Sequence, residues 1–285
     1  MNKENLDYLQ DKLKFLGFGE ASPMNDELAD KVGKGDISFQ LQTAVAYGEN
    51  AMVEAKLYFL QGNEERYYLQ KYDARLRYDG HPEKERSQTF FIYKGKGFTL
   101  KEAFNLLDGR AVYKKLQDPN GVEFLGWSQL NFSLRDPSGN YRYIRYGALY
   151  NYDLERVLNI YPILNLQNDA IRETLIRSLQ RGNAHPVYLV KDGKKAKCLI
   201  SANLETRLIT IQPIGGSARS IKEILNEELP FDVPDFVKAL PNGDEEEDES
   251  LETEVIGAPV EVDDPVREPV LAGVPSKASR KRSYK

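Results

Sequence analysis

The sequence predicts an α+β fold of three tandem helix-plus-antiparallel-meander units with extra helices, followed by a disordered tail. Three helix-like segments each end at a glycine, namely Gly35, Gly109 and Gly182, which are spaced by 74 and 73 residues. Strand-like runs separated by turn residues follow each of these glycines in the same order. Beyond residue 240 the composition becomes acidic and proline-containing. We interpret the glycine spacing and the strand order as an internal repeat, although helices that end at glycine also recur by chance.

The helices are predicted from apolar stripes and from capping residues. The first stripe consists of Leu6, Leu9, Leu13 and Leu16. A glycine just past the last apolar residue suits the left-handed conformation that closes many helices. Thr99 with Glu102 has the spacing of a capping box at the start of a helix. Ser220 with Glu223 predicts a second capping box, and Asp153 is placed to cap a further short helix.

The strands are predicted from alternation of apolar and polar residues. One apolar face comprises Val53, Ala55, Leu57 and Phe59, and another comprises Ala196, Cys198, Ile200 and Ala202. The dipeptide Asp192-Gly193 between apolar runs is a strong hairpin signal. A meander with one apolar face must bury that face, and the helix of its own unit is the nearest candidate to cover it.

The chain is predicted to divide into four segments. Residues 1–95 hold the N-terminal helix and the first unit, 96–165 the second unit, and 166–240 the third unit with closing helices. Residues 241–285 form an acidic tail with a basic end, with 12 acidic and 6 basic residues, which leaves 32 acidic and 33 basic residues in the body. Such a tail buries too little apolar area to offset its chain entropy, so we expect it to be disordered.

Composition excludes some classes of protein. No stretch approaches the 18 apolar residues of a membrane span, so we expect no membrane contact. The single cysteine, Cys198, excludes an internal disulfide, and the N-terminal segment is amphipathic rather than typical of a secretion signal. These features favour a cytoplasmic protein.

Phrases of the sequence resemble a known family. They are Lys3 to Leu9, Glu102 to Lys114 and Tyr152 to Glu155. Together they are similar to a family of uncharacterised Bacteroidetes proteins that carries a domain of unknown function and tends to be encoded on conjugative or other mobile elements. The resemblance covers most of residues 1–215 and excludes the tail. It implies a bacterial cytoplasm and a role near mobile DNA, and it assigns no activity to particular residues.

No assembled catalytic or metal site is evident in the sequence. His81, His185 and Cys198 are the only histidines and cysteine, which is too few nitrogen and sulfur ligands for a zinc site. His185 and Cys198 fall in neighbouring predicted strands, which leaves thiol catalysis open, but Cys198 lies on an apolar face where thiols are usually inert. We therefore expect no cofactor and favour a protein that is not an enzyme; an enzyme with an unrecognised carboxylate site is the alternative.

Two predicted strands interleave tyrosines with basic residues. On one of them, Lys71, Arg75 and Arg77 share one face. The opposite face of that strand carries Tyr68, Tyr72 and Leu76. The other strand contributes Tyr141, Arg142, Tyr143 and Arg145. Aromatic and basic side chains on a sheet stack bases and neutralise phosphates, which is typical of single-strand binding. The same pattern also describes an amphipathic strand with tyrosines in the core and arginines in solvent.

The end of the chain is basic. Its candidate phosphate contacts are Arg280, Lys281 and Arg282. A solubilising tail that shields its own acidic run is an equally open reading. The sequence as a whole favours a non-enzymatic binding module that serves mobile-element DNA processing or transfer, with single-stranded nucleic acid or a protein of that machinery as its partner. The alternative is a protein–protein adaptor that makes no contact with nucleic acid.

Overall fold

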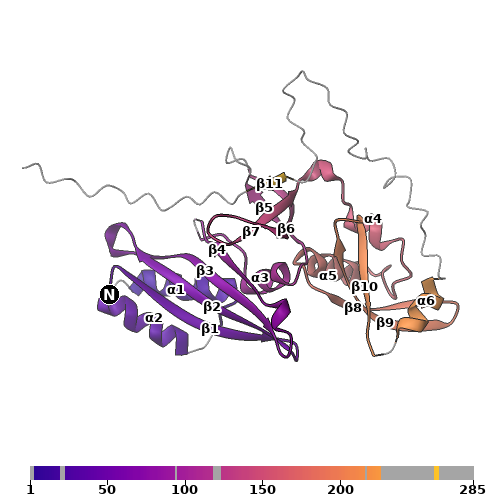
Figure 1. Ribbon diagram of the computed structural model, residues 1–285, viewed down its shortest axis with the longest axis horizontal. Coiled ribbons are helices and arrows are strands. Elements are labelled where there is room, and N and C mark those ends of the chain that lie inside the picture. Colours follow the sequence, from indigo (N-terminus) through magenta and orange to yellow (C-terminus); the bar gives the residue numbers. More distant parts are fainter. Residues whose placement is uncertain are drawn as a thin grey trace, which may run out of the picture.

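The protein forms three antiparallel sheets joined by helices, which follow one another along the long axis of the molecule (Figure 1). A computed structural model describes residues 3–19, 23–93, 95–117, 123–215, 217–225 and 260–262. Each of the three sheets follows a helix along the chain, so the predicted α+β class and the order of helix and meander are confirmed. In the part of the chain that is described, no helix has the length and apolar character needed to span a membrane.

The first sheet has the strand order β1-β2-β3-β4. Its strands are β1 (Ser38–Tyr47), β2 (Ala51–Gln61), β3 (Tyr67–Tyr78) and β4 (Arg86–Phe91). Helices α1 (Lys3–Leu16) and α2 (Pro23–Lys34) lie behind this sheet in Figure 1 and cover its inner face. The predicted stripe of leucines on α1 is buried, as are the four apolar residues predicted for β2. These two patterns therefore specify which faces of helix and sheet meet.

A β-bulge in β3 changes the face on which part of that strand's side chains lie. The faces predicted for the strand are therefore wrong in part. Tyr58 pairs with Lys71 but its neighbour Phe59 pairs with Leu69, so Gln70 is an extra residue. An extra residue shifts every preceding side chain to the other face of the sheet. Tyr68 is therefore 40% exposed instead of sharing a face with Tyr72 and Leu76, which are buried. The sequence also gave no expectation of β4, which follows a short 3-10 turn at Pro82–Lys84.

The second unit begins with α3 (Leu100–Leu107), where the predicted capping box of Thr99 and Glu102 is formed. The middle sheet follows, with β5 (Val112–Gln117), β6 (Glu123–Arg135) and β7 (Tyr141–Tyr146). A short strand from the predicted tail, β11 (Val260–Val262), pairs antiparallel with β7. The rest of residues 241–285 lies outside the described part of the chain.

The second unit ends with α4 (Leu154–Leu158), capped by Asp153 as predicted, and the third unit begins with α5 (Asp169–Gln180). Its sheet has the order β10-β9-β8, with β8 (His185–Lys191), β9 (Lys194–Asn203) and β10 (Leu208–Pro213). The hairpin predicted at Asp192-Gly193 joins β8 to β9. The capping box predicted at Ser220 is wrong, because α6 (Ala218–Leu225) begins before that residue and Glu223 pairs with Lys194 at 2.9 Å instead.

The repeated glycines have the same backbone conformation in all three units. Gly35, Gly109 and Gly182 have φ values of 75°, 88° and 80°, in the left-handed region that the helix ends require. Their surroundings differ, because a Cβ added at Gly182 would lie 2.8 Å from the backbone oxygen of Ala111, whereas nothing lies within 4 Å of one at Gly35. The helix end at Gly182 is thus packed tightly against the second unit.

The middle sheet is buried on both faces, because it contributes to two hydrophobic cores. Leu130 and Tyr143 point into the core shared with the first unit. Trp127 and Tyr146 point into the core shared with the third unit. Accordingly, α3 contacts strands of both the first and the middle sheet, and α5 contacts the middle and third sheets. We expected each helix to cover the meander of its own unit. Helices α3 and α5 also pack on a sheet of the preceding unit.

Candidate nucleic-acid interface

The outer face of the first sheet, opposite α1 and α2, carries the basic residues predicted for β3. Cross-strand pairing arranges its side chains in rows that run across the four strands. The first row is Gln40, Tyr58, Lys71 and Phe91, the next is Gln42, Lys56, Asp73 and Thr89, and the third is Ala44, Glu54, Arg75 and Ser87. Arg77 lies beyond the third row, opposite Met52. These side chains range from half-buried to exposed, so the face is accessible to a ligand.

The first row combines aromatic rings with a cation. The Nζ of Lys71 lies 5.0 Å from the ring centroid of Tyr58 and 5.9 Å from that of Phe91. The hydroxyl of Tyr58 donates to Oδ2 of Asp73 at 2.6 Å. This hydrogen bond, with smaller contributions from burial and from the charge of Asp73, raises the pKa of Tyr58 to about 12. The hydroxyl of Tyr58 therefore stays protonated, and keeps donating to Asp73, well above neutral pH.

The two arginines of the face are paired with carboxylates. Arg77 Nη1 lies 2.9 Å from Glu54 Oε1, and Arg75 Nη1 lies 3.7 Å from Oε2 of the same glutamate. Glu85 contacts both arginines from the other side, with Arg77 Nε at 3.9 Å from its Oε2. The hydrogen bond to Glu54 raises the pKa of Arg77. A phosphate that binds these guanidinium groups has to compete with both glutamates.

A hollow lies where the outer face meets the start of β1. Its volume is about 610 Å³, which is within the usual range for a small-molecule site. Lys31 and Lys71 line it together with Asp36, Gln40 and the ring of Tyr58. The hollow is thus lined by two cations, one carboxylate, amide groups and aromatic residues that include Tyr58.

The residues predicted on β7 are placed differently. Tyr141 and Tyr143 are 7% and 1% exposed, so their ring faces are occupied by the protein itself. Arg135 lies over the ring of Tyr141, with 4.0 Å from its Cζ to the ring centroid, and donates to its hydroxyl at 2.7 Å. Arg142 and Arg145 are half-buried, and β11 pairs along this strand. The β7 residues therefore do not join Lys71, Arg75 and Arg77 on one surface, and Arg280, Lys281 and Arg282 lie outside the described residues.

The histidines and the cysteine do not assemble a reactive group. His185 Nδ1 lies 2.9 Å from the hydroxyl oxygen of Ser178, and the strand register pairs Val187, not His185, with Cys198. Cys198 is fully buried, and burial raises the pKa of its thiol to about 11. No cluster of three His, Cys, Asp or Glu side chains that would suit a metal occurs among the described residues.

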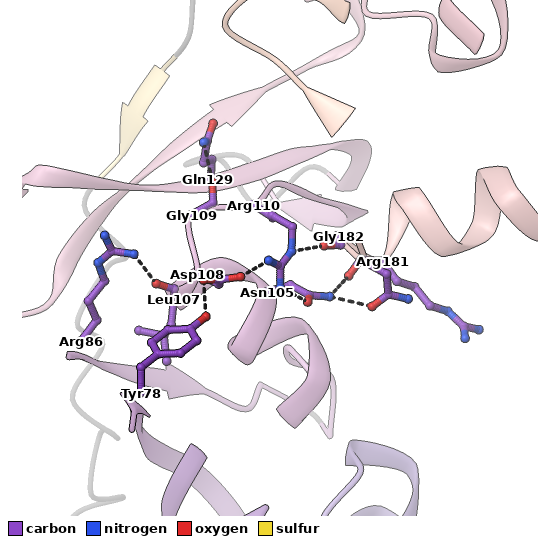
Figure 2. A network of polar contacts seen from close by, with 11 residues as sticks. Tyr78, Arg86, Asn105, Leu107, Asp108, Gly109, Arg110, Gln129, Arg181 and Gly182 are labelled. Carbon is purple, nitrogen blue, oxygen red and sulfur yellow. Dashed lines mark hydrogen bonds and ion pairs between the residues drawn. The ribbon is translucent and has the colours of Figure 1, made fainter. Parts of the chain in front are cut away.

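A polar network joins the helix ends of the second and third units (Figure 2). Arg110 Nε donates to the oxygen of Gly182 at 2.7 Å, its Nη2 donates to Oδ1 of Asn105 at 2.7 Å, and its Nη1 pairs with Asp108. Asn105 in turn donates to the oxygen of Arg181 at 2.7 Å. Burial lowers the pKa of Arg110 to about 10. Because its donors meet a main-chain oxygen, an amide oxygen and a carboxylate within the fold, we assign this arginine to holding the units together.

An aromatic cleft that was not predicted from the sequence lies between the middle sheet and the third unit. Its volume is about 520 Å³. Its walls include Tyr113, Trp127, Tyr146, Tyr150 and Tyr152. The only available signal was the aromatic series at 146, 150 and 152 around Gly147, which sequence reasoning assigns to a core as readily as to a site.

No family model, no curated protein and no solved structure matches the chain. The arrangement of side chains is therefore the basis for a functional conclusion.

Proposed function

We propose that the protein is a non-enzymatic binding module whose outer sheet face holds a single-stranded nucleic acid. The observation that carries the proposal is the row Tyr58–Lys71–Phe91, with Arg75 and Arg77 farther along the same strand. Aromatic faces stack bases of any sequence, and neighbouring cations neutralise phosphates. The mobile-element role remains a prediction that rests on the family resemblance alone.

The expected contacts follow from strand spacing. Tyr58 and Phe91 lie on the two strands that flank Lys71, so their backbones are separated by about 9–10 Å. Bases stacked on the two rings would place the connecting phosphate near Lys71. Arg75 and Arg77 would then contact phosphates farther along the chain, after exchanging their glutamate partners for phosphate oxygens.

The test is a titration of single- and double-stranded DNA and RNA against the full chain at several salt concentrations. Single strands should bind, with a logarithmic salt slope of about 0.7 per phosphate contacted. The triple substitution Lys71→Gln, Arg75→Gln and Arg77→Gln should lower this slope and the affinity. A matched control with three exposed cations elsewhere, Lys34→Gln, Arg177→Gln and Arg219→Gln, should change both much less.

An adaptor role is the second candidate, and β11 is the observation that favours it. Val260–Val262 of this chain pairs with β7 at the sheet edge, and addition of a strand to an edge is a common mode of peptide recognition, which supports this candidate. The titration separates the two functions. Absence of binding to every nucleic acid at about 50 mM salt, where phosphate contacts are strong, would overturn the proposed function and leave the adaptor.

A further inference from the structure

The aromatic cleft has three half-buried rings that suit a cation, those of Tyr113, Tyr150 and Tyr152, which pack on the buried rings of Trp127 and Tyr146. The rings of Tyr113 and Tyr152 lie 5.2 Å and 5.5 Å from the ring of Trp127, and Tyr146 and Tyr150 form a second pair at 4.5 Å. The negative faces of such rings attract ammonium and guanidinium groups. One ring of the cleft already does so, because the Cζ of Arg207 lies 4.5 Å from the centroid of Tyr150.

The charged residues that line the cleft are acidic, although Arg207 and Arg172 contact its rim at Tyr150 and Glu155. Asp153 and Glu155 line the cleft, and among its described lining residues there is no lysine, arginine or histidine. Asp153 accepts the main-chain N–H of Arg156 at 3.0 Å, and Glu155 lies 3.5 Å from Arg172. Two carboxylates next to π faces disfavour a phosphate and favour an apolar stem that ends in a cation. The cleft and the outer face of the first sheet are thus suited to opposite charges.

From this geometry we propose that the cleft binds the basic end of the same chain, through Arg280, Lys281 and Arg282. Charge complementarity selects this occupant, since the tail combines an acidic run at 244–249 with a basic cluster at its end. Arginine and lysine side chains would lie against the half-buried rings and pair with Asp153 and with Glu155, in competition with Arg172 for the latter.

The tether makes this docking accessible. Val262 of β11 pairs with Tyr143 on β7, and Tyr146 at the end of that strand lines the cleft. Seventeen residues, 263–279, separate β11 from Arg280. Extended, they span up to roughly 60 Å, which is ample for a return to the cleft. A tether of this kind gives an effective concentration on the order of millimolar, so a weak site is enough for occupancy.

The chain itself supplies the probes for a test. Trp127 is the only tryptophan and forms a wall of the cleft. Cys198 is the only cysteine, and its buried thiol with a raised pKa leaves it unreactive in the folded protein. The variant Ser283→Cys, labelled with a small acceptor fluorophore, therefore gives one donor and one acceptor. Energy transfer from Trp127 to position 283 measures whether the basic end lies in the cleft.

The proposal predicts high transfer at low salt, falling at about 1 M salt, where the Debye length shrinks to about 3 Å. Neutralising the cleft with Asp153→Asn and Glu155→Gln should reduce the low-salt transfer to the high-salt value, while asparagine preserves the helix cap. The matched control is Glu27→Gln with Glu49→Gln, two exposed carboxylates of the first unit, which should leave transfer unchanged.

Three results would overturn the proposal. The first is transfer that does not respond to neutralising the cleft, and the second is an equal loss in the matched control. The third is loss of transfer only when the run at 244–249 is neutralised, which would show that the basic end pairs with its own acidic run. An unchanged circular dichroism spectrum and melting temperature of the cleft variant are required for the expected result.

Discussion

The strands β3 and β7 carry similar mixtures of tyrosine and arginine, yet the fold treats them in opposite ways. On β3 the basic residues share an accessible face with Tyr58 of the neighbouring strand. On β7 the tyrosines are buried and the arginines are half-buried, since the middle sheet lies between two cores. The difference does not lie in the strands themselves. It lies in what packs on the second face of each sheet, which only the tertiary structure determines.

The largest expected effect is a difference in protein stability between variants of a tyrosine on β7 and a tyrosine on the outer face of the first sheet. Tyr143→Ala should lower the free energy of unfolding by about 3–5 kcal/mol, as expected for removing a buried aromatic ring. Tyr58→Ala, on the outer face, should cost about 1 kcal/mol or less, including its hydrogen bond to Asp73. Urea denaturation followed by circular dichroism measures both.

Binding should rank the two tyrosine positions in the reverse order. Tyr58→Ala should weaken single-strand binding by about 1–3 kcal/mol, the usual worth of one stacked base. Tyr143→Phe keeps the buried ring and should leave binding unchanged. Equal losses of stability at the two tyrosines would contradict the assignment of an open face and an enclosed one.

The second effect is a difference in stability between alanine variants at two equivalent helix ends, Gly35 in the first unit and Gly182 in the third. Gly35→Ala should cost about 1–2 kcal/mol, because only the left-handed backbone opposes it. Gly182→Ala should cost about 1–3 kcal/mol more, since its Cβ would meet the oxygen of Ala111 at 2.8 Å. Thermal and urea unfolding of the two variants test this. Similar losses would mean that the junction at Gly182 relaxes without strain.

The smallest effect concerns the glutamates that hold the β3 arginines. Exposed ion pairs are worth about 0.2–1 kcal/mol each, so Glu54→Gln with Glu85→Gln should tighten nucleic-acid binding up to about fivefold. The matched control, Glu173→Gln with Glu223→Gln, changes the net charge equally but frees cations of the third unit. If both pairs tighten binding equally, the gain reflects net charge and not Arg75 and Arg77.

Local signals in the sequence were sufficient for most elements. The capping box at Thr99, the helix ends at the repeated glycines and the hairpin at Asp192-Gly193 depend on a few adjacent residues, and each is present. The bulge at Gln70 could not be foreseen, because it is a mismatch between two strands and leaves no signature within one. For the same reason the sequence could not indicate which tyrosines are accessible.

The candidate site was predictable only in part. Lys71, Arg75 and Arg77 lie on one face as the alternation predicted, but their aromatic partners Tyr58 and Phe91 come from neighbouring strands. The cleft around Trp127 assembles side chains from 113 to 180, which no sequence spacing connects. Sites built across elements therefore required the fold.

The position of the middle sheet limits how this protein can be divided. Because each of its faces is completed by a different neighbour, a fragment that lacks either outer unit would present an unmatched apolar layer to water. Such fragments should aggregate, whereas the intact chain should melt in a single transition. Domain mapping by truncation is therefore a poor guide to this molecule, and point substitutions in the whole chain are the appropriate tool.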